Sequence, residues 1–181
     1  MAKFSSRVTR LLVAGILITI GGCSESNPTI APDNREVRYE PIEVRANVQG
    51  TGSGIVDEAK NDKLIGPEGG TLVIPGGHSL TFPAGALSAP TRIEAKVNPR
   101  YIEVEFSPHG LQFPAGHEPT LTLSAQGANV APFQTLNVVY LERGRVSEVL
   151  PTEFDVVSKN ATAKLQHFSG YALAGGRSVA N

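Results

Sequence analysis

The 181-residue sequence contains no tryptophan and a single cysteine, Cys23, which excludes several kinds of site. One cysteine cannot form an intrachain disulfide or a cysteine zinc cluster. With four tyrosines and no tryptophan, the chain has little of the aromatic platform on which sugar binders typically stack their ligands. It has no basic block and a formal net charge of −1, so nucleic acid is not an expected partner.

Motifs for catalysis and for cofactor binding are absent as well. There is no GxSxG nucleophile elbow, no Walker loop and no dinucleotide fingerprint in the sequence. The four histidines, His78, His109, His117 and His167, show no metal-ligand spacing such as HExxH. We therefore expect no metal, no cofactor and no enzymatic turnover of a separate substrate.

The first 22 residues have the features of a signal peptide. Lys3, Arg7 and Arg10 give a basic start, and a run of apolar residues follows at 11–20. Ten residues rise about 15 Å as a helix, about half of a bilayer's hydrocarbon core, so this run is too short to span a membrane. The stretch 20–23, Ile-Gly-Gly-Cys, resembles the bacterial lipobox. The alternative is an ordinary secretory signal with a cysteine at its cleavage site.

The lipobox resemblance implies cleavage before Cys23 and attachment of diacylglycerol, with palmitate-type acyl chains, to its sulfur, which would leave no thiol nucleophile. Removing residues 1–22 removes three of the 16 basic residues and none of the 17 acidic ones, so the mature charge is −4. Two or more acyl chains hold a protein at a membrane durably. Ser24 follows the cysteine where aspartate would favour the inner membrane, so we expect the outer membrane, on its periplasmic or surface face.

Residues 23–63 are rich in serine, proline, asparagine, glycine and charge, and we expect them to form the lipid anchor and a flexible tether. Within this segment Ile42–Val48 alternates well and is a candidate edge strand. Asp57, Glu58 and Asp62 lack the alternation and glycine of a calcium-binding loop, so a solvated linker is expected there.

From residue 64 onward, prolines recur every seven to nine residues as far as Pro108 and separate short alternating runs such as 101–106, YIEVEF. No window carries apolar residues at helical spacing over three turns. This pattern predicts an all-β fold, a single β-sandwich over 64–176 followed by a short tail at 177–181. Hairpin turns are expected at Arg143-Gly144 and at Lys159-Asn160; the Asn160-Ala-Thr sequence is interpreted as a turn and not as a glycosylation site.

A short internal repeat is also present: LTFPAG at 80–85 recurs as LQFPAG at 111–116. In each copy a strand would end in a buried phenylalanine, proline would break the ladder and glycine would allow a tight corner. We interpret the pair as two equivalent corners of the sandwich and not as a ligand site.

Several motifs in order resemble the ZU5 domain. They are Gly69-Gly70, the stretch 82–86 (FPAGA), the stretch 107–111 (SPHGL) with Phe113, and a closing strand near Leu121. The resemblance covers roughly residues 64–125 and implies a β-sandwich that binds proteins or stiffens assemblies. We therefore expect a non-enzymatic interaction or structural module, anchored through Cys23, with an unknown protein partner. His109 lies in this motif, where we expect it to cap backbone carbonyls.

Some eukaryotic ZU5 proteins cut themselves between Phe and Ser of an HFS motif, and this chain carries His167-Phe168-Ser169 in its expected last strand. In that alternative, the Ser169 hydroxyl attacks the Phe168 carbonyl, the resulting ester is hydrolysed, and His167 handles the proton. The simpler interpretation is a β-bulge that lets Leu165 and Phe168 face one core. The nearest candidate acid in sequence is Asp155.

Overall fold

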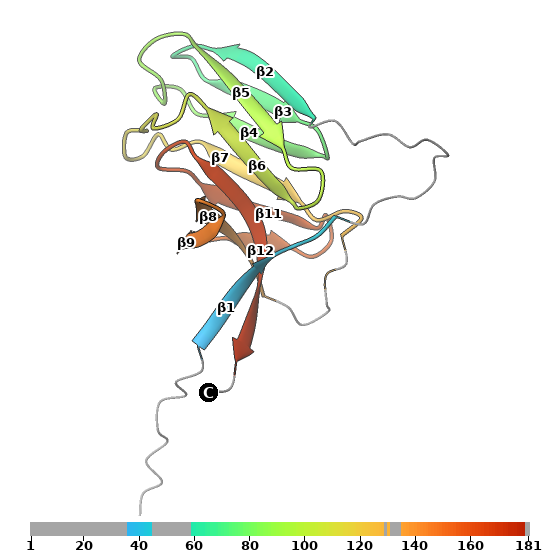
Figure 1. Ribbon diagram of the computed structural model, residues 1–181. Coiled ribbons are helices and arrows are strands. Elements are labelled where there is room, and N and C mark those ends of the chain that lie inside the picture. The colour runs from blue at the N-terminus through green and yellow to red at the C-terminus, as the bar shows by residue number, and fades with distance from the viewer. Residues whose placement is uncertain (1–35, 45–58, 129, 131–134, 180–181) are drawn as a thin grey trace, which may run out of the picture. The chain divides into compact units, whose positions relative to one another are not determined.

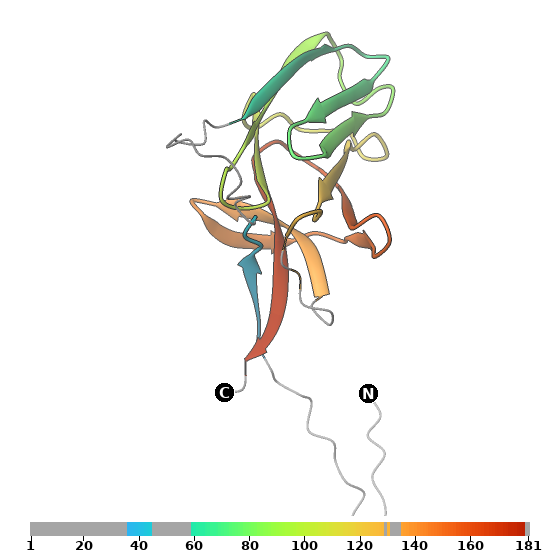
Figure 2. The same cartoon turned by 90° about the vertical axis from the view of Figure 1, so that its right-hand side faces the viewer.

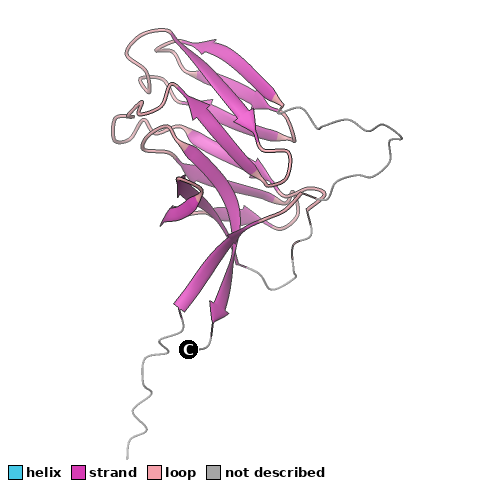
Figure 3. Ribbon diagram, viewed as in Figure 1, coloured by secondary structure: helices cyan, strands magenta, loops and turns pink. Residues whose placement is uncertain are grey.

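The computed structural model describes residues 36–44, 59–128, 130 and 135–179. Within these residues every regular element is a β-strand, as Figure 3 shows. The strands form two sheets in which all neighbouring strands are antiparallel. The predicted all-β sandwich is therefore confirmed.

One sheet has seven strands in the order β2-β5-β6-β12-β8-β9, and β1 also pairs with β12 (Figure 1). Its strands are β1 (Glu36–Pro41), β2 (Lys60–Ile65), β5 (Thr91–Val97), β6 (Glu103–Ser107), β8 (Thr135–Glu142), β9 (Arg145–Val149) and β12 (Gly170–Val179). The second sheet has five strands in the order β10-β11-β7-β4-β3. Its strands are β3 (Gly70–Ile74), β4 (His78–Phe82), β7 (Thr120–Ser124), β10 (Glu153–Asp155) and β11 (Asn160–Lys164).

The core lies between the two sheets and follows the alternation of the sequence. On β6, Val104 and Phe106 are fully buried, while Glu103 and Glu105 point away from the core. Because successive side chains of a strand point to opposite faces, alternate residues face the core. One cluster of buried side chains from both sheets results. On β8 and β12 the intervening residues Val139, Leu141, Ala172 and Ala174 are buried as well, in a second small cluster.

Both predicted hairpin turns are present. Arg143 and Gly144 connect β8 to β9 with φ angles of 51° and 74°, and Glu142 pairs with Arg145 across the turn. Positive φ at both central residues gives the twist that tight hairpins favour. The second hairpin joins β10 to β11, with Lys159 at φ 56° and Asn160 as the first residue of β11.

The N-terminal boundary at residue 64 was wrong, because strands occupy part of the range expected to be a tether. Residues 36–41 form β1, which pairs with the end of β12, and 60–63 begin β2. Ile42 lies at a fork in the sheet, where the strand that pairs with β12 changes from β6 to β1. Its N–H donates to Leu173 O (2.8 Å), and its carbonyl accepts from Ile102 N–H (2.9 Å). Ile42 is buried in the core, so this segment is part of the sandwich.

The boundaries of the domain shift accordingly at both ends. Residues 43 and 44 form isolated bridges, while 45–48 of the expected edge strand lie outside the described residues. At the C-terminus β12 continues to Val179, beyond the expected end at 176, because β1 supplies hydrogen-bond partners for it. Figures 1 and 2 both show β1 beside the end of β12. The described residues between 36 and 179 belong to one compact unit.

Candidate functional site

The His167-Phe168-Ser169 tripeptide lies in the crossover between the two sheets. Residues 165–169 carry the chain from β11 in the five-stranded sheet to β12 in the seven-stranded sheet, so the expected single strand with a bulge was wrong. Leu165 and Phe168 are both buried in the shared core, as predicted. The phase of the alternation breaks because the chain changes sheets at this point.

Phe168 is surrounded by the aromatic rings of the core. Its ring centroid lies 5.2 Å from Phe106, 5.0 Å from Phe113 and 6.0 Å from Phe82. Phe82 and Phe113 are the phenylalanines of the two FPAG repeats, and they lie 6.0 Å from each other. Phe82 ends β4, as predicted, but Phe113 follows an isolated bridge at Gln112 and ends no strand, so the prediction was wrong for the second copy. Both phenylalanines nevertheless contact the ring of Phe168.

The two corners are also joined by a hydrogen bond. His117, just after the second corner, donates from Nδ1 to the carbonyl of Ala84 in the first corner at 2.7 Å. Gly85 and Gly116 both have a φ angle of 83°, which residues other than glycine rarely adopt. His117 therefore has a structural role at this corner.

The crossover is held by a buried tyrosine. The Tyr171 hydroxyl donates to His167 O at 2.6 Å and lies 3.4 Å from His167 Nδ1. Burial raises the pKa of Tyr171, and the Glu148 carboxylate and Tyr140 add to this rise, so the hydroxyl stays protonated as a donor. The bond from tyrosine to an upstream carbonyl resembles the tyrosine corner of other β-sandwiches.

Self-cleavage would require a base to activate Ser169. Among the residues that the structure describes, no side chain is hydrogen-bonded to the Ser169 hydroxyl. The Asp155 carboxylate accepts from Val157 N–H (2.9 Å) and Ser158 Oγ (2.7 Å) in the β10–β11 turn. These bonds lower the pKa of Asp155, the Ser158 bond most.

The remaining histidines have separate partners. His78 is buried, and its Nδ1 accepts from Ser124 N–H at 2.9 Å; burial lowers its pKa to about 4. His109, expected to cap carbonyls, instead places Nε2 3.4 Å from a Glu105 carboxylate oxygen. Within the described residues, no group of three or more His, Cys, Asp or Glu side chains is arranged to hold a metal.

Several residues singled out in the sequence lie outside the part that the structure describes. These are Cys23 with its signal peptide, and Asp57 and Glu58. Asp62 is described, and it forms an ion pair with Arg92. Among the described residues no helix is long and apolar enough to cross a membrane.

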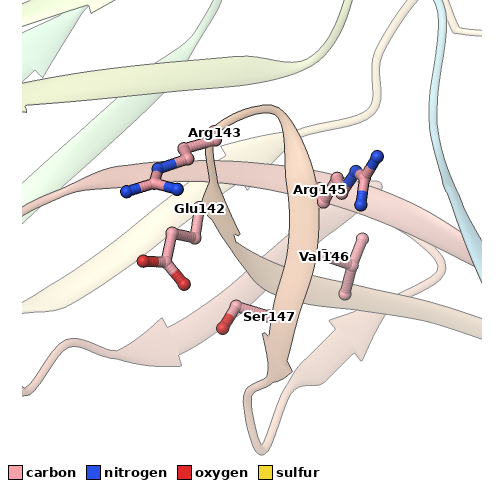
Figure 4. Close-up of a pocket in the computed structure, with 5 residues that line it drawn as sticks. All are labelled: Glu142, Arg143, Arg145, Val146 and Ser147. Carbon is pink, nitrogen blue, oxygen red and sulfur yellow. The ribbon is translucent and has the colours of Figure 1, made fainter.

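The hollows on the surface do not gather reactive groups. A hollow of about 510 Å³ borders the β8–β9 turn, and Figure 4 shows Glu142 and Arg143 on one side of this hairpin and Arg145 and Val146 on the other. A larger hollow of about 820 Å³ has three carboxylates that already have partners in the protein. The pairs are Glu40 with Arg177, Glu43 with Arg100, and Glu103 with Asn98. Burial raises the pKa of Glu103.

On the outer face of the seven-stranded sheet, β2, β5 and β6 carry charged side chains, whereas Val139 and Leu141 of β8 and Ala172 and Ala174 of β12 form a second, smaller buried cluster. Cross-strand ion pairs join β2 to β5, Lys60 with Glu94 and Asp62 with Arg92. Glu105 on β6 lies in the same layer. Any partner that covered this face would have to remove water from several charges, which is unfavourable unless each finds a new counterion.

The outer face of the five-stranded sheet is different. We call it the threonine face, and it consists of Thr71, Val73, Ser79, Thr81, Thr120, Thr122 and Thr162. The strand register aligns these side chains in two rows across the sheet. One row is Thr71, Thr81 and Thr120, and the other is Val73, Ser79, Thr122 and Thr162. Thr71 and Thr81 are hydrogen-bonded through their hydroxyls (3.1 Å).

Among the described residues, charged side chains reach the threonine face from its β3 edge and from β11 and β10 on the other side. At the β3 edge, Asn61 donates to Val73 O (2.7 Å) and Lys63 donates to Thr71 O (2.9 Å). On the other side, Lys164 of β11 lies beside Thr120 of the central strand β7, and Glu153 of the edge strand β10 lies beside Thr162.

Two further features border the threonine face. A hollow of about 600 Å³ lies over β7, β10 and β11 and is lined in part by Thr120 and Thr162. Beyond it, the β10–β11 turn exposes Val156 (73%) and Val157 (89%). We call these two residues the valine tip.

Sequence reasoning missed the threonine face, although it predicted the strands that carry it. The runs TLVI, SLTF and LTLSA show which residues point outward. They do not show that β4 lies between β3 and β7, because antiparallel strands can pair in many orders. Comparison with protein-family models and with curated proteins found no match to this chain.

Proposed function

We propose that this protein is a lipid-anchored module of a bacterial envelope, held at the outer membrane through Cys23, that binds a protein partner or has a structural role without enzymatic activity. The ZU5-like motifs and the lipobox-like stretch at 20–23 support this proposal. The threonine face is its docking surface.

The assignment of the docking surface to the threonine face is supported by the contrast in charge between the outer faces of the two sheets. Centres of protein interfaces are depleted in charged residues. Threonine and serine lose little when they are covered, because their hydroxyls find new partners easily. The central strands β4 and β7 of the threonine face are uncharged, whereas β5 and β6 on the other sheet carry ion pairs and carboxylates.

The anchor is tested by fractionation. Wild-type protein is expected in the detergent phase and in the outer-membrane fraction, and Cys23→Ser in the aqueous phase. Intact mass of the native protein reports the acyl chains. Wild-type protein that fractionates as soluble would contradict the anchor and leave the ordinary secretory signal.

The docking surface is tested by crosslinking in intact cells. A photoreactive amino acid at Thr122 should give a defined crosslinked product, and the same amino acid at Arg92 on the charged face should not. Crosslinking at Arg92 but not at Thr122 would contradict the proposal, because it would place the docking surface on the seven-stranded sheet.

We also propose that the Phe168–Ser169 bond remains intact in most molecules. The Tyr171 bond to His167 O and the burial of Phe168 support a structural role for the tripeptide. A C-terminally tagged chain should therefore run as one species in a denaturing gel. A tagged fragment that starts at Ser169 and disappears in Ser169→Ala would favour the self-cleaving alternative.

A further inference from the structure

We propose that the valine tip rests on the membrane that holds the anchor, with its two valines among the lipid headgroups and the first acyl carbons. This inference rests on the proposed lipid anchor at Cys23 and adds to it a second, non-covalent membrane contact. It is supported by the exposure of the tip, by hydrogen bonds within its turn, by the charge around it, and by the length of chain that leads to Cys23.

The valine tip is the most exposed apolar feature among the described residues. Val156 and Val157 are 73% and 89% exposed, more than any other large apolar side chain in that part of the chain. Single exposed apolar side chains are common on protein surfaces, but two neighbours at the end of a turn form one continuous apolar surface. Such a surface is suited to leave water for an apolar environment.

Polar groups of this turn have partners inside the protein. The Asp155 carboxylate accepts from Val157 N–H (2.9 Å) and from Ser158 Oγ (2.7 Å). The loop at 125–126 donates two more hydrogen bonds to carbonyls of the turn, at 2.8 and 3.4 Å. Polar groups that are already bonded lose little when the water around them is removed. The tip can therefore enter the headgroup region at low cost.

The two turns beside the valine tip are uncharged. Residues 125–128 (Ala-Gln-Gly-Ala) bond to it directly. The turn 75–77 (Pro-Gly-Gly) precedes His78, whose Nδ1 accepts from Ser124 N–H at the end of β7. Ser124 pairs with Asn160, which directly follows the turn of the tip, so all three turns lie at one end of the five-stranded sheet. A membrane that meets this end does not have to remove water from charges on the two neighbouring turns.

The charges of the tip's own turn balance each other. Asp155 and Lys159 flank the valines and have opposite signs. Glu153 and Lys164 lie further back along β10 and β11, and they also have opposite signs. Anionic lipids attract clusters of basic residues, and this turn has no such cluster. The contact should therefore be apolar in origin and should suit a zwitterionic phospholipid.

The chain between the sandwich and Cys23 is long enough to let the tip reach the lipid. Residues 24–36 span at most about 45 Å. From Glu36 to Val44 the chain spans at most about 28 Å, and Val44 bridges to Ala128 in the loop that bonds to the tip. Cys23 and the valine tip can therefore touch the same membrane surface.

The small size of the tip favours a lipid surface over a protein partner. Two side chains offer far less than the approximately 800 Å² that each partner buries in a stable protein interface. A membrane requires no matching shape, and the anchor keeps the membrane at a high effective concentration. A weak apolar contact is then sufficient to orient the domain.

The test uses the lipidated full-length chain in vesicles of phosphatidylcholine. A Val157→Cys variant is labelled with a fluorophore that nitroxide groups on the lipid acyl chains quench. The lipid on Cys23 keeps that sulfur from reacting with the label. Strong quenching is expected at position 157. The matched control is Leu64→Cys, which is 63% exposed on the other sheet and should be quenched severalfold less.

Second-site changes test whether the valines make the contact. In the labelled Val157→Cys chain, Val156→Asn should reduce quenching severalfold, and Leu64→Asn should leave it unchanged. Because Val156 is exposed, its replacement should not alter thermal unfolding. Quenching should also be the same at low and high salt, and with or without phosphatidylglycerol in the vesicles, because the charges of the turn balance.

Three outcomes would overturn the proposal. One is equal quenching at positions 157 and 64. Another is quenching that Val156→Asn leaves unchanged, which would show that the tether alone brings the label to the lipid. The third is quenching that requires phosphatidylglycerol and disappears in salt, which would show an electrostatic contact.

Flotation with the vesicles and intact mass separate these outcomes from a failure of the anchor. A chain that floats, and whose tip is not quenched, would contradict only the valine tip. A chain that does not float would contradict the anchor and this inference with it. A photoreactive amino acid at Val157 that crosslinks to a protein in cells, without quenching in vesicles, would assign the tip to a protein partner instead.

Discussion

The two sheets of this sandwich share one core but present opposite surfaces to solvent. The seven-stranded sheet exposes lysines, arginines and carboxylates, two pairs of which form ion pairs between β2 and β5. The five-stranded sheet exposes two rows of hydroxyl side chains with Val73 among them. Both faces fit a strand pattern, but covering the face with fewer charges costs less desolvation free energy.

The two sheets also differ in how the chain closes their edges. The seven-stranded sheet receives the N-terminal strand β1, whose end inserts Ile42 into the core. The five-stranded sheet ends at β3, where Asn61 and Lys63 from β2 bond to its carbonyls. Side chains that satisfy edge carbonyls keep another strand from pairing there. A partner is therefore directed to the face of this sheet and not to its β3 edge.

The largest loss of stability is expected from a change in the core that the two sheets share. Phe168→Ala should lower the free energy of unfolding by about 3–5 kcal/mol, because the ring contacts phenylalanines from both sheets and leaves a cavity. Denaturant unfolding measures it. A loss below about 1 kcal/mol, or two separate transitions, would show that the sheets do not form one cooperative unit.

Acid should weaken the five-stranded sheet through His78. Its folded-state pKa, about 4, is below the value of about 6.5 expected in the unfolded chain, so unfolding favours proton uptake. The stability that neutral His78 contributes is fully present above pH 6.5. As the pH falls from 6.5 to 4, the free energy of unfolding should decrease by about 3 kcal/mol. Melting curves across this range measure the loss. His78→Asn keeps an acceptor for Ser124 N–H and should remove this step, while His109→Gln in the turn after β6 should retain it.

The N-terminal fork should matter to the seven-stranded sheet. Ile42→Ala should cost about 2–3 kcal/mol, since Ile42 is buried in the core, although its position at a fork allows partial collapse. The matched change on the threonine face, Val73→Ala, should cost less than about 0.5 kcal/mol because Val73 is 66% exposed. If the two variants lost the same free energy of unfolding, Ile42 would not be packed in the core as described.

The crossover between the sheets should depend on Tyr171. Tyr171→Phe keeps the ring and removes the hydroxyl that donates to His167 O, so a loss of about 1–2 kcal/mol is expected. Thermal unfolding measures this loss. Tyr140→Phe, whose hydroxyl makes no bond among the described residues, is the control and should have a smaller effect.

The smallest effect is expected on the charged face. Arg92→Ala removes an ion pair whose arginine is 74% exposed, so the cost should be below about 1 kcal/mol and should shrink further in salt. Unfolding at low and high ionic strength measures both. A cost that salt leaves unchanged would assign Arg92 a packing role through its aliphatic stem.

Much of the fold was determined by the sequence because it depends on neighbouring residues. Alternation in YIEVEF sets which side chains of β6 are buried, and Arg143-Gly144 allows the tight turn after β8. The same local rules placed Leu165 and Phe168 in one core. They could not show that the chain changes sheets between these residues, since a bulge and a crossover break the alternation alike.

Which strands become neighbours is seen only in the folded chain. Residues 36–41 resemble a linker in composition, and they become a strand because the end of β12, more than 130 positions away, offers unpaired backbone groups. The threonine face likewise needs β3, β4, β7 and β11 in one order and register. Local alternation states which way each side chain points, but a surface is made of side chains from strands far apart in sequence, and only pairing brings them together.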